Sequence, residues 1–348
     1  MSTNNTKATI IALCFGVIGA VGGYLSGLPA PFLTGPALVV SLAGVYGFRL
    51  LVPVWLRDTC FILIGIGMGS GVTPQVVEAA SKWPLGIITL LVSLLSILTV
   101  STWTLKHLFG FDRVSAVLAS SPGHFSYILG LSADTQADIQ RVSIVQSLRV
   151  LFLTMLVPLM FVAIGGDTAV AAGRLPLLMP WLHILVVVLF SVLIGWGFKR
   201  IRVPAAFLLG GMLISTLAHV NNHTTGDLPA WLSVFAFLVM GTLIGSRFSG
   251  ITPSALRQSL AAGLVVTAIA AVISVLASFI AAQILGLPIN HILIAFAPGG
   301  VETMAAMAVL LEVDPSFVAV HHVIRLLFLT ILVPIILSLE KALRAADN

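Results

Sequence analysis

Apolar residues fill most of this chain in long stretches that short polar joints separate. A helix needs about 20 residues to cross the hydrocarbon of a bilayer, and an open strand edge cannot exist there because its backbone groups would lack partners. Proline, glycine, asparagine and aspartate mark the joints. The pattern therefore predicts twelve helical elements, at about 9–26, 29–48, 53–71, 84–108, 114–131, 142–164, 176–198, 203–220, 229–246, 259–285, 292–311 and 317–339.

Composition places these helices in a membrane. The 348 residues are 59% hydrophobic and only 8% charged, whereas a soluble domain carries about 25% charged residues. That shortage excludes a soluble enzyme, a disordered chain and a nucleic-acid binder, although the isoelectric point is near 9.6. The two cysteines, Cys14 and Cys60, form neither a disulfide framework nor a metal motif. We therefore expect an all-α polytopic membrane protein with no bound metal or cofactor.

The second half of the chain repeats the first. Five short motifs recur in the same order about 176 residues later, and the clearest pair is 149–158 and 325–334, with eight of ten residues identical. This pattern predicts an internal duplication with halves at 1–172 and 173–348, an arrangement that many secondary transporters use. The other four pairs are 29–35 with 204–210, 53–56 with 229–232, 65–70 with 241–246, and 121–123 with 297–299.

Positive charges indicate the orientation of the two halves. If the Pro-Gly elements at 114–131 and 292–311 are re-entrant, each half has five crossings, and an odd number inverts the second half. With both termini cytoplasmic, thirteen of the 17 Lys and Arg lie inside, as the positive-inside rule requires. Crossing elements would instead place the basic run at 199–202 outside. We expect an inverted repeat with about ten transmembrane helices and two Pro-Gly elements, whether broken crossings or re-entrant hairpins.

The two Pro-Gly breaks are the first candidate for a binding site. Proline removes a backbone donor and glycine permits unusual backbone angles, so each break leaves helix ends inside the membrane. The N-terminal end of a half-helix offers free N–H groups and partial positive charge to an anion. The alternative is a simple proline kink. The candidate substrate-binding residues are Pro122, Gly123 and His124 in the first half and Pro298, Gly299 and Gly300 in the second.

Two arginines are the second candidate. Arg149 and Arg325 each lie well inside an apolar helix, where a charged side chain is costly and normally faces a partner or a wet cavity. Their planar guanidinium groups suit a carboxylate or another oxyanion. The alternatives are a structural ion pair of Arg325 with Glu302, and an Arg149 side chain that reaches toward the cytoplasmic edge. We predict that both arginines bind substrate.

The titratable candidates for ion coupling lie in the second half. Glu302 is an acidic residue near a membrane midplane, and its counterpart in the first half is Ser126. His322 stands where the first half has Gln146, and a histidine beside an arginine could titrate near neutral pH. A proton could couple through either residue, or a sodium ion through backbone carbonyls at the breaks. Polar packing is the alternative.

Two smaller features carry structural predictions. Asp138 and Asp314 match each other ahead of the arginine helices, and we expect both to cap those helices. The glycine pairs at 65 and 69 and at 241 and 245 are typical of close packing between helices.

The motifs Ala297-Pro-Gly-Gly-Val-Glu302, Asp314-Pro315 and His322-x-x-Arg325 resemble the duplicated AbrB family of bacterial membrane proteins. That family is unrelated to the soluble DNA-binding regulator that shares its name. Its architecture is similar to that of the cation/proton antiporter and anion transporter group, which has inverted halves and broken helices near the midplane. The resemblance implies that Pro122-Gly123 and Pro298-Gly299 mark such breaks. The midplane aspartate pair of an antiporter is missing from the sequence, which argues against simple sodium/proton exchange.

We therefore expect an ion-coupled secondary active transporter that moves a small organic anion, a carboxylate by preference, across the bacterial inner membrane by alternating access. The alternatives are a membrane-embedded regulator or sensor that binds a ligand without moving it, and a passive channel. An enzyme is not expected, because the sequence shows no nucleophile or metal cluster. The expected partners are the anion and the lipid bilayer, without nucleic acid; a homodimer stays open.

Overall fold

The computed structural model describes residues 3–71, 83–123, 125–164, 177–311 and 313–346, and it does not describe the side chains of Ser126, Glu302 and residues 340–346. This part of the chain forms fourteen helices and no sheet. The first seven are α1 (Thr3–Leu25), α2 (Pro31–Val45), α3 (Val54–Ser70), α5 (Trp83–Leu108), α6 (Arg113–Ser120), α7 (Phe125–Ala133) and α8 (Ile139–Ala163). The second seven are α9 (Trp181–Arg200), α10 (Ala206–Val220), α11 (Ala230–Ser246), α12 (Pro253–Leu285), α13 (Ile289–Phe296), α14 (Val301–Leu310) and α15 (Pro315–Ala346).

The helix bounds repeat along the chain. Each helix of the second run begins about 176 residues after its counterpart in the first run. For example, α6 begins at Arg113 and α13 begins at Ile289. The two predicted Pro-Gly elements are each split into two short helices, so both breaks are confirmed. The largest departure from this spacing is at α12. This helix begins at Pro253 because the Thr252 hydroxyl caps its first turn.

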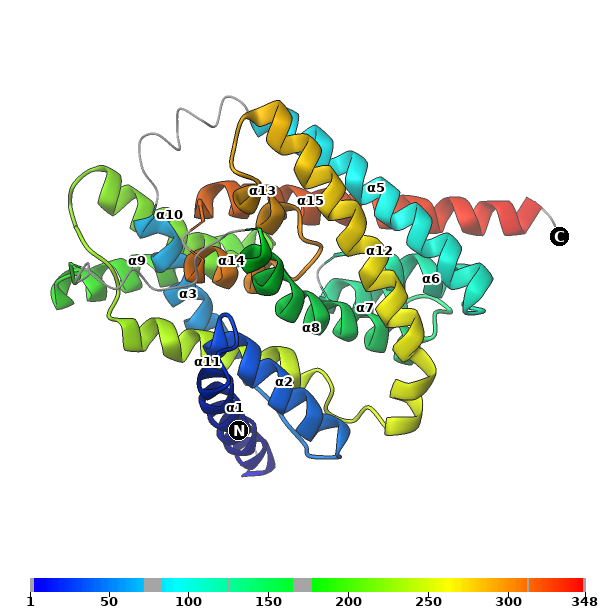
Figure 1. Cartoon of the computed structure of the whole chain (residues 1–348), viewed down its shortest axis with the longest axis horizontal. Helices are drawn as coiled ribbons and strands as arrows, with labels where there is room; N and C mark the ends of the chain where they lie inside the picture. The colour runs from blue at the N-terminus through cyan, green and yellow to red at the C-terminus, as the bar shows by residue number, and fades with distance from the viewer. Residues whose placement is uncertain (1–2, 72–82, 124, 165–176, 312, 347–348) are drawn as a thin grey trace.

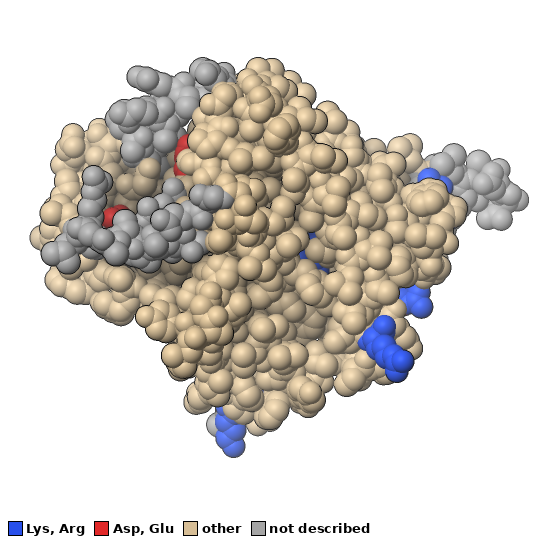
Figure 2. Space-filling view, in the orientation of Figure 1, with Lys and Arg blue, Asp and Glu red and all other residues tan. Residues whose placement is uncertain are grey.

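Six described helices are long and apolar enough to cross a bilayer: α1, α5, α8, α9, α12 and α15. Shorter apolar helices accompany them. Large hydrophobic side chains such as Leu182, Leu185 and Leu189 of α9 point outward and are exposed. The face shown in Figure 2 carries few charges, and its basic side chains lie mainly along the lower and right-hand rim. The chain is therefore a multi-pass membrane protein.

The helices pack as two groups, and each group takes matching helices from both runs. In the first group α3 packs against α10, α2 against α1 and α11, and α9 against α10. We call α1–α3 with α9–α11 the panel bundle. In the second group α12 packs against α5 and α8, and α15 against α13 and α14. We call α5–α8 with α12–α15 the hairpin bundle, which fills the upper and right-hand part of Figure 1.

Glycines bring the helices of the panel bundle into backbone contact. A Cβ added to Gly65 of α3 would lie 2.1 Å from the carbonyl oxygen of Leu208 in α10. A Cβ added to Gly241 of α11 would lie 2.3 Å from the carbonyl oxygen of Leu33 in α2. Side chains are excluded at both places, so the close packing predicted from the glycine pairs is confirmed.

In each pair of short helices, the start of the first helix lies close to the residue that follows the second helix and precedes the next long one. The backbone N–H of Asp138, before α8, donates to Ser115 Oγ in the first turn of α6 at 2.7 Å. In the second run, the N–H of Asp314, before α15, contacts His291 Nδ1 in α13 at 3.3 Å. The chain therefore turns back between α6 and α7 and again between α13 and α14. We call these pairs the first and second hairpins.

The two matched aspartates cap the helices that follow the hairpins. Asp138 Oδ1 accepts the N–H of Arg141 at 3.0 Å. Asp314 Oδ1 accepts the N–H groups of Ser316 and Phe317 at 2.9 and 3.2 Å. Both predicted caps are confirmed, and each one fixes where an arginine-bearing helix starts.

Candidate functional site

The tip of each hairpin brings two opposite helix ends together. In the first hairpin α6 ends at Ser120 and α7 begins at Phe125, with Pro122 and Gly123 in between. In the second, α13 ends at Phe296 and α14 begins at Val301, with Pro298, Gly299 and Gly300 in between. The end of α6 or α13 exposes carbonyl groups, whereas the start of α7 or α14 exposes N–H groups.

Arg149 of α8 binds the carbonyl end of α6. Its guanidinium nitrogens donate to the carbonyl oxygens of Ala119 at 3.4 Å and Ser121 at 3.2 Å. Gln146, one turn earlier, donates to the carbonyl oxygens of Leu118 at 2.7 Å and Ser121 at 2.8 Å. The amide oxygen of Gln146 also accepts from Arg149. Gln146 and Arg149 together hold the first hairpin tip against α8.

Arg325 of α15 repeats this arrangement in the second hairpin. Its two terminal nitrogens donate to the carbonyl oxygens of Ala297 at 2.7 Å and Gly299 at 2.6 Å. His322 Nε2 contacts the carbonyl oxygen of Ile294 at 3.0 Å, in the place that Gln146 takes in the first half. A cation is favourable at the negative, carbonyl end of a helix. Both arginines therefore bind carbonyl groups at the hairpin tips, at or just beyond the carbonyl ends of α6 and α13.

A cavity of about 200 Å³ lies between the panel bundle and the hairpin tips. The panel bundle contributes residues of α3 and α11 to its wall, and the hairpin bundle contributes both tips with parts of α8 and α15. Arg149 lies in the wall, whereas Arg325 is not among the described lining residues and donates a hydrogen bond to the carbonyl oxygen of one of them, Gly299. The described lining residues are Arg57, Gly123, Phe125, Gln146, Arg149, Val150, Leu243, Arg247, Gly299, Gly300, Val301 and Leu326.

The described wall of this cavity is positively charged. Arg57, Arg149 and Arg247 all line it, and its described lining residues include no aspartate or glutamate. The first residues of α7 and α14, Phe125 and Val301, also lie in the wall, so both helix N-termini point their partial positive charge at the same space. Arginine side chains and helix N-termini are the groups with which proteins bind carboxylates and phosphates.

Two of the three lining arginines were not predicted as site residues. Arg57 and Arg247 count toward the cytoplasmic charges in the sequence, yet both line the cavity from the panel bundle. The guanidinium of Arg247 lies over the ring of Phe125 at 4.6 Å and so links the panel bundle to the first hairpin tip. A signal was present, because Ser233 and Gly71 occupy the matching positions of the repeat. Charge that breaks the internal symmetry would have identified both arginines.

The remaining predicted residues fall into three groups. Pro122 and Pro298 lie in the breaks, where their neighbours Gly123, Gly299 and Gly300 line the cavity. His124 lies outside the described residues. Glu302 belongs to the first turn of α14, but its side chain lies outside the described part of the structure.

His322 is fully buried, as is Arg325 one helical turn later. The role of His322 in coupling stays a prediction. Among the described residues, no group of three His, Cys, Asp or Glu side chains could hold a metal ion.

Comparison with known proteins identifies the family. The family model described as "Transition state regulatory protein AbrB" matches residues 32–340, which is most of the chain and includes both hairpins. This chain belongs to the AbrB family. A relative named "Putative regulator AbrB" from Escherichia coli (strain K12) is 27% identical over 303 residues, covering 86% of each chain. The "Uncharacterized protein YhjN" of Bacillus subtilis (strain 168) is 26% identical over 361 residues, covering 92% of this chain and 91% of the relative.

Membership of the AbrB family agrees with the resemblance that the Pro-Gly-Gly, Asp-Pro and His-x-x-Arg motifs suggested. The matched region contains every described lining residue of the cavity, from Arg57 to Leu326. The names of the two relatives speak of a regulator or of no function, and neither name describes a substrate.

Proposed function

We propose that this AbrB family protein is a secondary active transporter that carries a small organic anion, a carboxylate by preference, across the bacterial inner membrane. The observation that carries the proposal is the cavity between the two bundles, where Arg149, Arg247 and the N-termini of α7 and α14 meet. On this proposal the chain acts without catalysing a reaction, and its partners are the anion and the bilayer.

The arginines of the described wall favour an anion over a cation or a neutral solute. Each helix N-terminus contributes about 0.3–1 kcal/mol to binding of a negative group, and hydrogen bonds between an arginine and a carboxylate are stronger than neutral ones. A volume of about 200 Å³ is small beside the roughly 300–1,000 Å³ of pockets for drug-sized ligands. A carboxylate of a few carbon atoms fits both requirements.

The hairpins support an inverted, alternating-access topology. Because each hairpin begins and ends at one place, we interpret both as re-entrant, which leaves five crossings in each half and inverts the second half. Arg57 and Arg247 lie at helix ends that the positive-inside rule assigns to the cytoplasm. The cavity of this conformation would then face the cytoplasm, with both termini on that side.

Either a proton or a sodium ion could drive transport. A proton could be taken up by Glu302 in the first turn of α14 or by His322, which lies one helical turn before Arg325. A sodium ion could instead bind backbone carbonyls at the breaks. Uptake driven separately by a proton gradient and by a sodium gradient distinguishes these routes.

The test is transport in proteoliposomes. A thermal-shift screen with acetate, lactate, succinate and citrate first identifies the carboxylate that raises the melting temperature of the purified protein most. We expect saturable uptake of that carboxylate and counterflow of its labelled form. Uptake without saturation or counterflow would indicate a channel, and binding without uptake would indicate the regulator that the name of one relative suggests.

A cavity-filling variant ties transport to the cavity. Leu243 of α11 lines the cavity and is partly buried, so Leu243→Trp should block uptake while the melting temperature changes little. Phe235 lies on the same helix with 40% of its surface exposed, and Phe235→Trp is the matched control that should keep uptake. Full uptake by Leu243→Trp would contradict transport through this cavity.

A further inference from the structure

Arg57 lies in the wall between two cavities. It lines the central cavity with Arg149 and Arg247, and it also lines a second cavity of about 180 Å³ at the start of α10. Lys199, at the end of α9, contributes to the second cavity as well. These residues lie at the ends of α3 and α9 that the proposed topology puts in the cytoplasm. An anion that leaves the central cavity on this side would pass Arg57.

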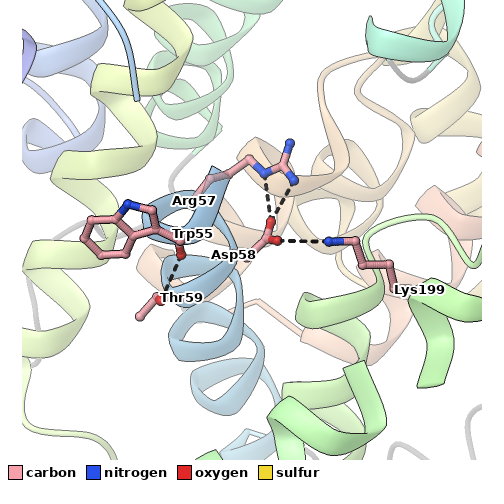
Figure 3. A network of polar contacts seen from close by, with 5 residues as sticks. All are labelled: Trp55, Arg57, Asp58, Thr59 and Lys199. Atoms are coloured by element: carbon pink, nitrogen blue, oxygen red, sulfur yellow. Dashed lines mark hydrogen bonds and ion pairs between the residues drawn. The ribbon is translucent and has the colours of Figure 1, made fainter. Parts of the chain in front are cut away.

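The carboxylate of the neighbouring Asp58 already binds two of the three guanidinium nitrogens of Arg57. Asp58 Oδ1 accepts from Arg57 Nε at 2.9 Å and from one terminal nitrogen, Nη2, at 2.7 Å. Neither bond uses the other terminal nitrogen, Nη1, which points away from Asp58 (Figure 3). Asp58 Oδ2 lies 3.6 Å from Lys199 Nζ. Asp58 is thus held from both sides, by an arginine through one oxygen and by a lysine near the other.

The exposure of these side chains makes a change of partner inexpensive. The Arg57 side chain is 33% exposed and that of Lys199 is 57% exposed, whereas that of Asp58 is 14% exposed. Water and salt screen the more exposed Arg57 and Lys199 ends of these pairs, whereas the mostly buried Asp58 needs a cationic partner. If Arg57 turned toward an incoming carboxylate, Asp58 would keep Lys199 as a partner and would not become an unpaired buried charge.

This network has no equivalent in the other half of the repeat. Ser233, Val234 and Gly23 occupy the positions that match Arg57, Asp58 and Lys199. A cavity at the start of α2, the counterpart of α10, is lined by Gly27, Leu28, Pro29, Ala30, Pro31, Leu159, Val162 and Ala163, none of them charged among the described lining residues. Packing of the repeated helices therefore does not require the three charges. The three charges are therefore specific to one half of the repeat at each position.

We infer that Arg57 binds the carboxylate of the transported anion at the cytoplasmic mouth of the cavity, and that Asp58 competes with the anion for Arg57. Arg57 exchanges one carboxylate for another, so the anion is released when Asp58 returns to the guanidinium group. Lys199 holds Asp58 while the anion occupies Arg57. This inference rests on the proposed function and adds a binding residue to it, together with the group that limits its affinity.

A double-mutant cycle tests the inference, using equilibrium binding of the carboxylate that the thermal-shift screen identifies. Arg57→Ala should weaken binding about tenfold, as expected for loss of one charge-assisted contact, and Arg57→Lys should restore part of it. Asp58→Asn should strengthen binding about threefold because the amide competes poorly for a guanidinium group. In the Arg57→Ala background, Asp58→Asn should have no effect.

The matched control removes a neighbouring cytoplasmic charge outside both cavities. Arg200 lies over the ring of Trp196 at 4.0 Å, and Arg200→Gln should leave binding unchanged. The inference is overturned if Asp58→Asn fails to strengthen binding, or if it strengthens binding equally without Arg57, since the effect would then be one of general charge. If the unmodified protein binds no carboxylate in the screen, the proposed function itself fails. If it binds a carboxylate but the Asp58 variants behave otherwise than predicted, only the inference about Arg57 and Asp58 fails.

Discussion

At the scale of single residues, Arg149 and Arg325 fasten the two hairpin tips to α8 and α15 through hydrogen bonds to backbone carbonyls. Arg149 and Arg325 were recognisable because a charge inside an apolar helix requires a partner. In the described structure both guanidinium groups bind backbone carbonyls that follow a half-helix. Such a contact joins residues 28 positions apart, and no local pattern encodes it. Arg149 also lines the cavity. In the proposed function it therefore holds the first hairpin tip and faces the anion at the same time.

Gln146 should be essential for the first hairpin tip. It donates to two buried carbonyls and accepts from Arg149, so Gln146→Ala removes three buried hydrogen bonds. Loss of such bonds costs about 1–3 kcal/mol, and we expect a lower melting temperature in detergent together with weaker carboxylate binding. Ser147 is the control, because its buried hydroxyl has no partner among the described residues, and Ser147→Ala should be nearly neutral. Equal melting temperatures for the two variants would contradict this role of Gln146.

At the scale of helices, the sequence predicted most of what the structure contains. Helix bounds follow from the length of each apolar stretch, and the breaks follow from Pro-Gly pairs, both of which are local features. The glycine pairs also predicted close packing correctly, because glycines on one face of a helix allow the backbone of a neighbouring helix to approach closely. The role of Arg57 and Arg247 was not predictable in this way. Each lies at a helix end, where the positive-inside rule already explains a basic residue.

The contact between α3 and α10 provides a test at this scale. Gly65→Ala should destabilise the panel bundle and lower the melting temperature by several degrees, because the added Cβ would lie 2.1 Å from the carbonyl oxygen of Leu208 and the helices would have to separate. Gly67, two residues later, would meet only the Val309 side chain at 3.5 Å, an ordinary contact. Gly67→Ala should therefore be tolerated. Comparable melting temperatures for both variants would show that α3 does not depend on backbone contact with α10.

At the scale of the whole molecule, the internal repeat and the packing describe different divisions of the chain. The repeat divides it near residue 172, whereas each bundle draws helices from both sides of that point. Repeated motifs report ancestry and leave open which helices pack together, so the two bundles were not predictable from the motifs. This regrouping places both hairpin tips on one cavity, with one tip contributed by each half. The position of the cavity between two separately packed bundles is what makes alternating access plausible for this AbrB family protein.

Protection of a cysteine in the cavity tests most directly whether an anion occupies it. In a chain with the exposed Cys14 changed to Ala and the buried Cys60 kept, Leu243→Cys should react with a membrane-impermeant maleimide from the cytoplasmic side. Ser254→Cys, at an exposed position at the start of α12, is the control. We predict that the carboxylate identified by thermal shift slows the reaction at position 243 and leaves position 254 unchanged. Equal labelling of position 243 with and without saturating carboxylate would contradict an anion site between the bundles.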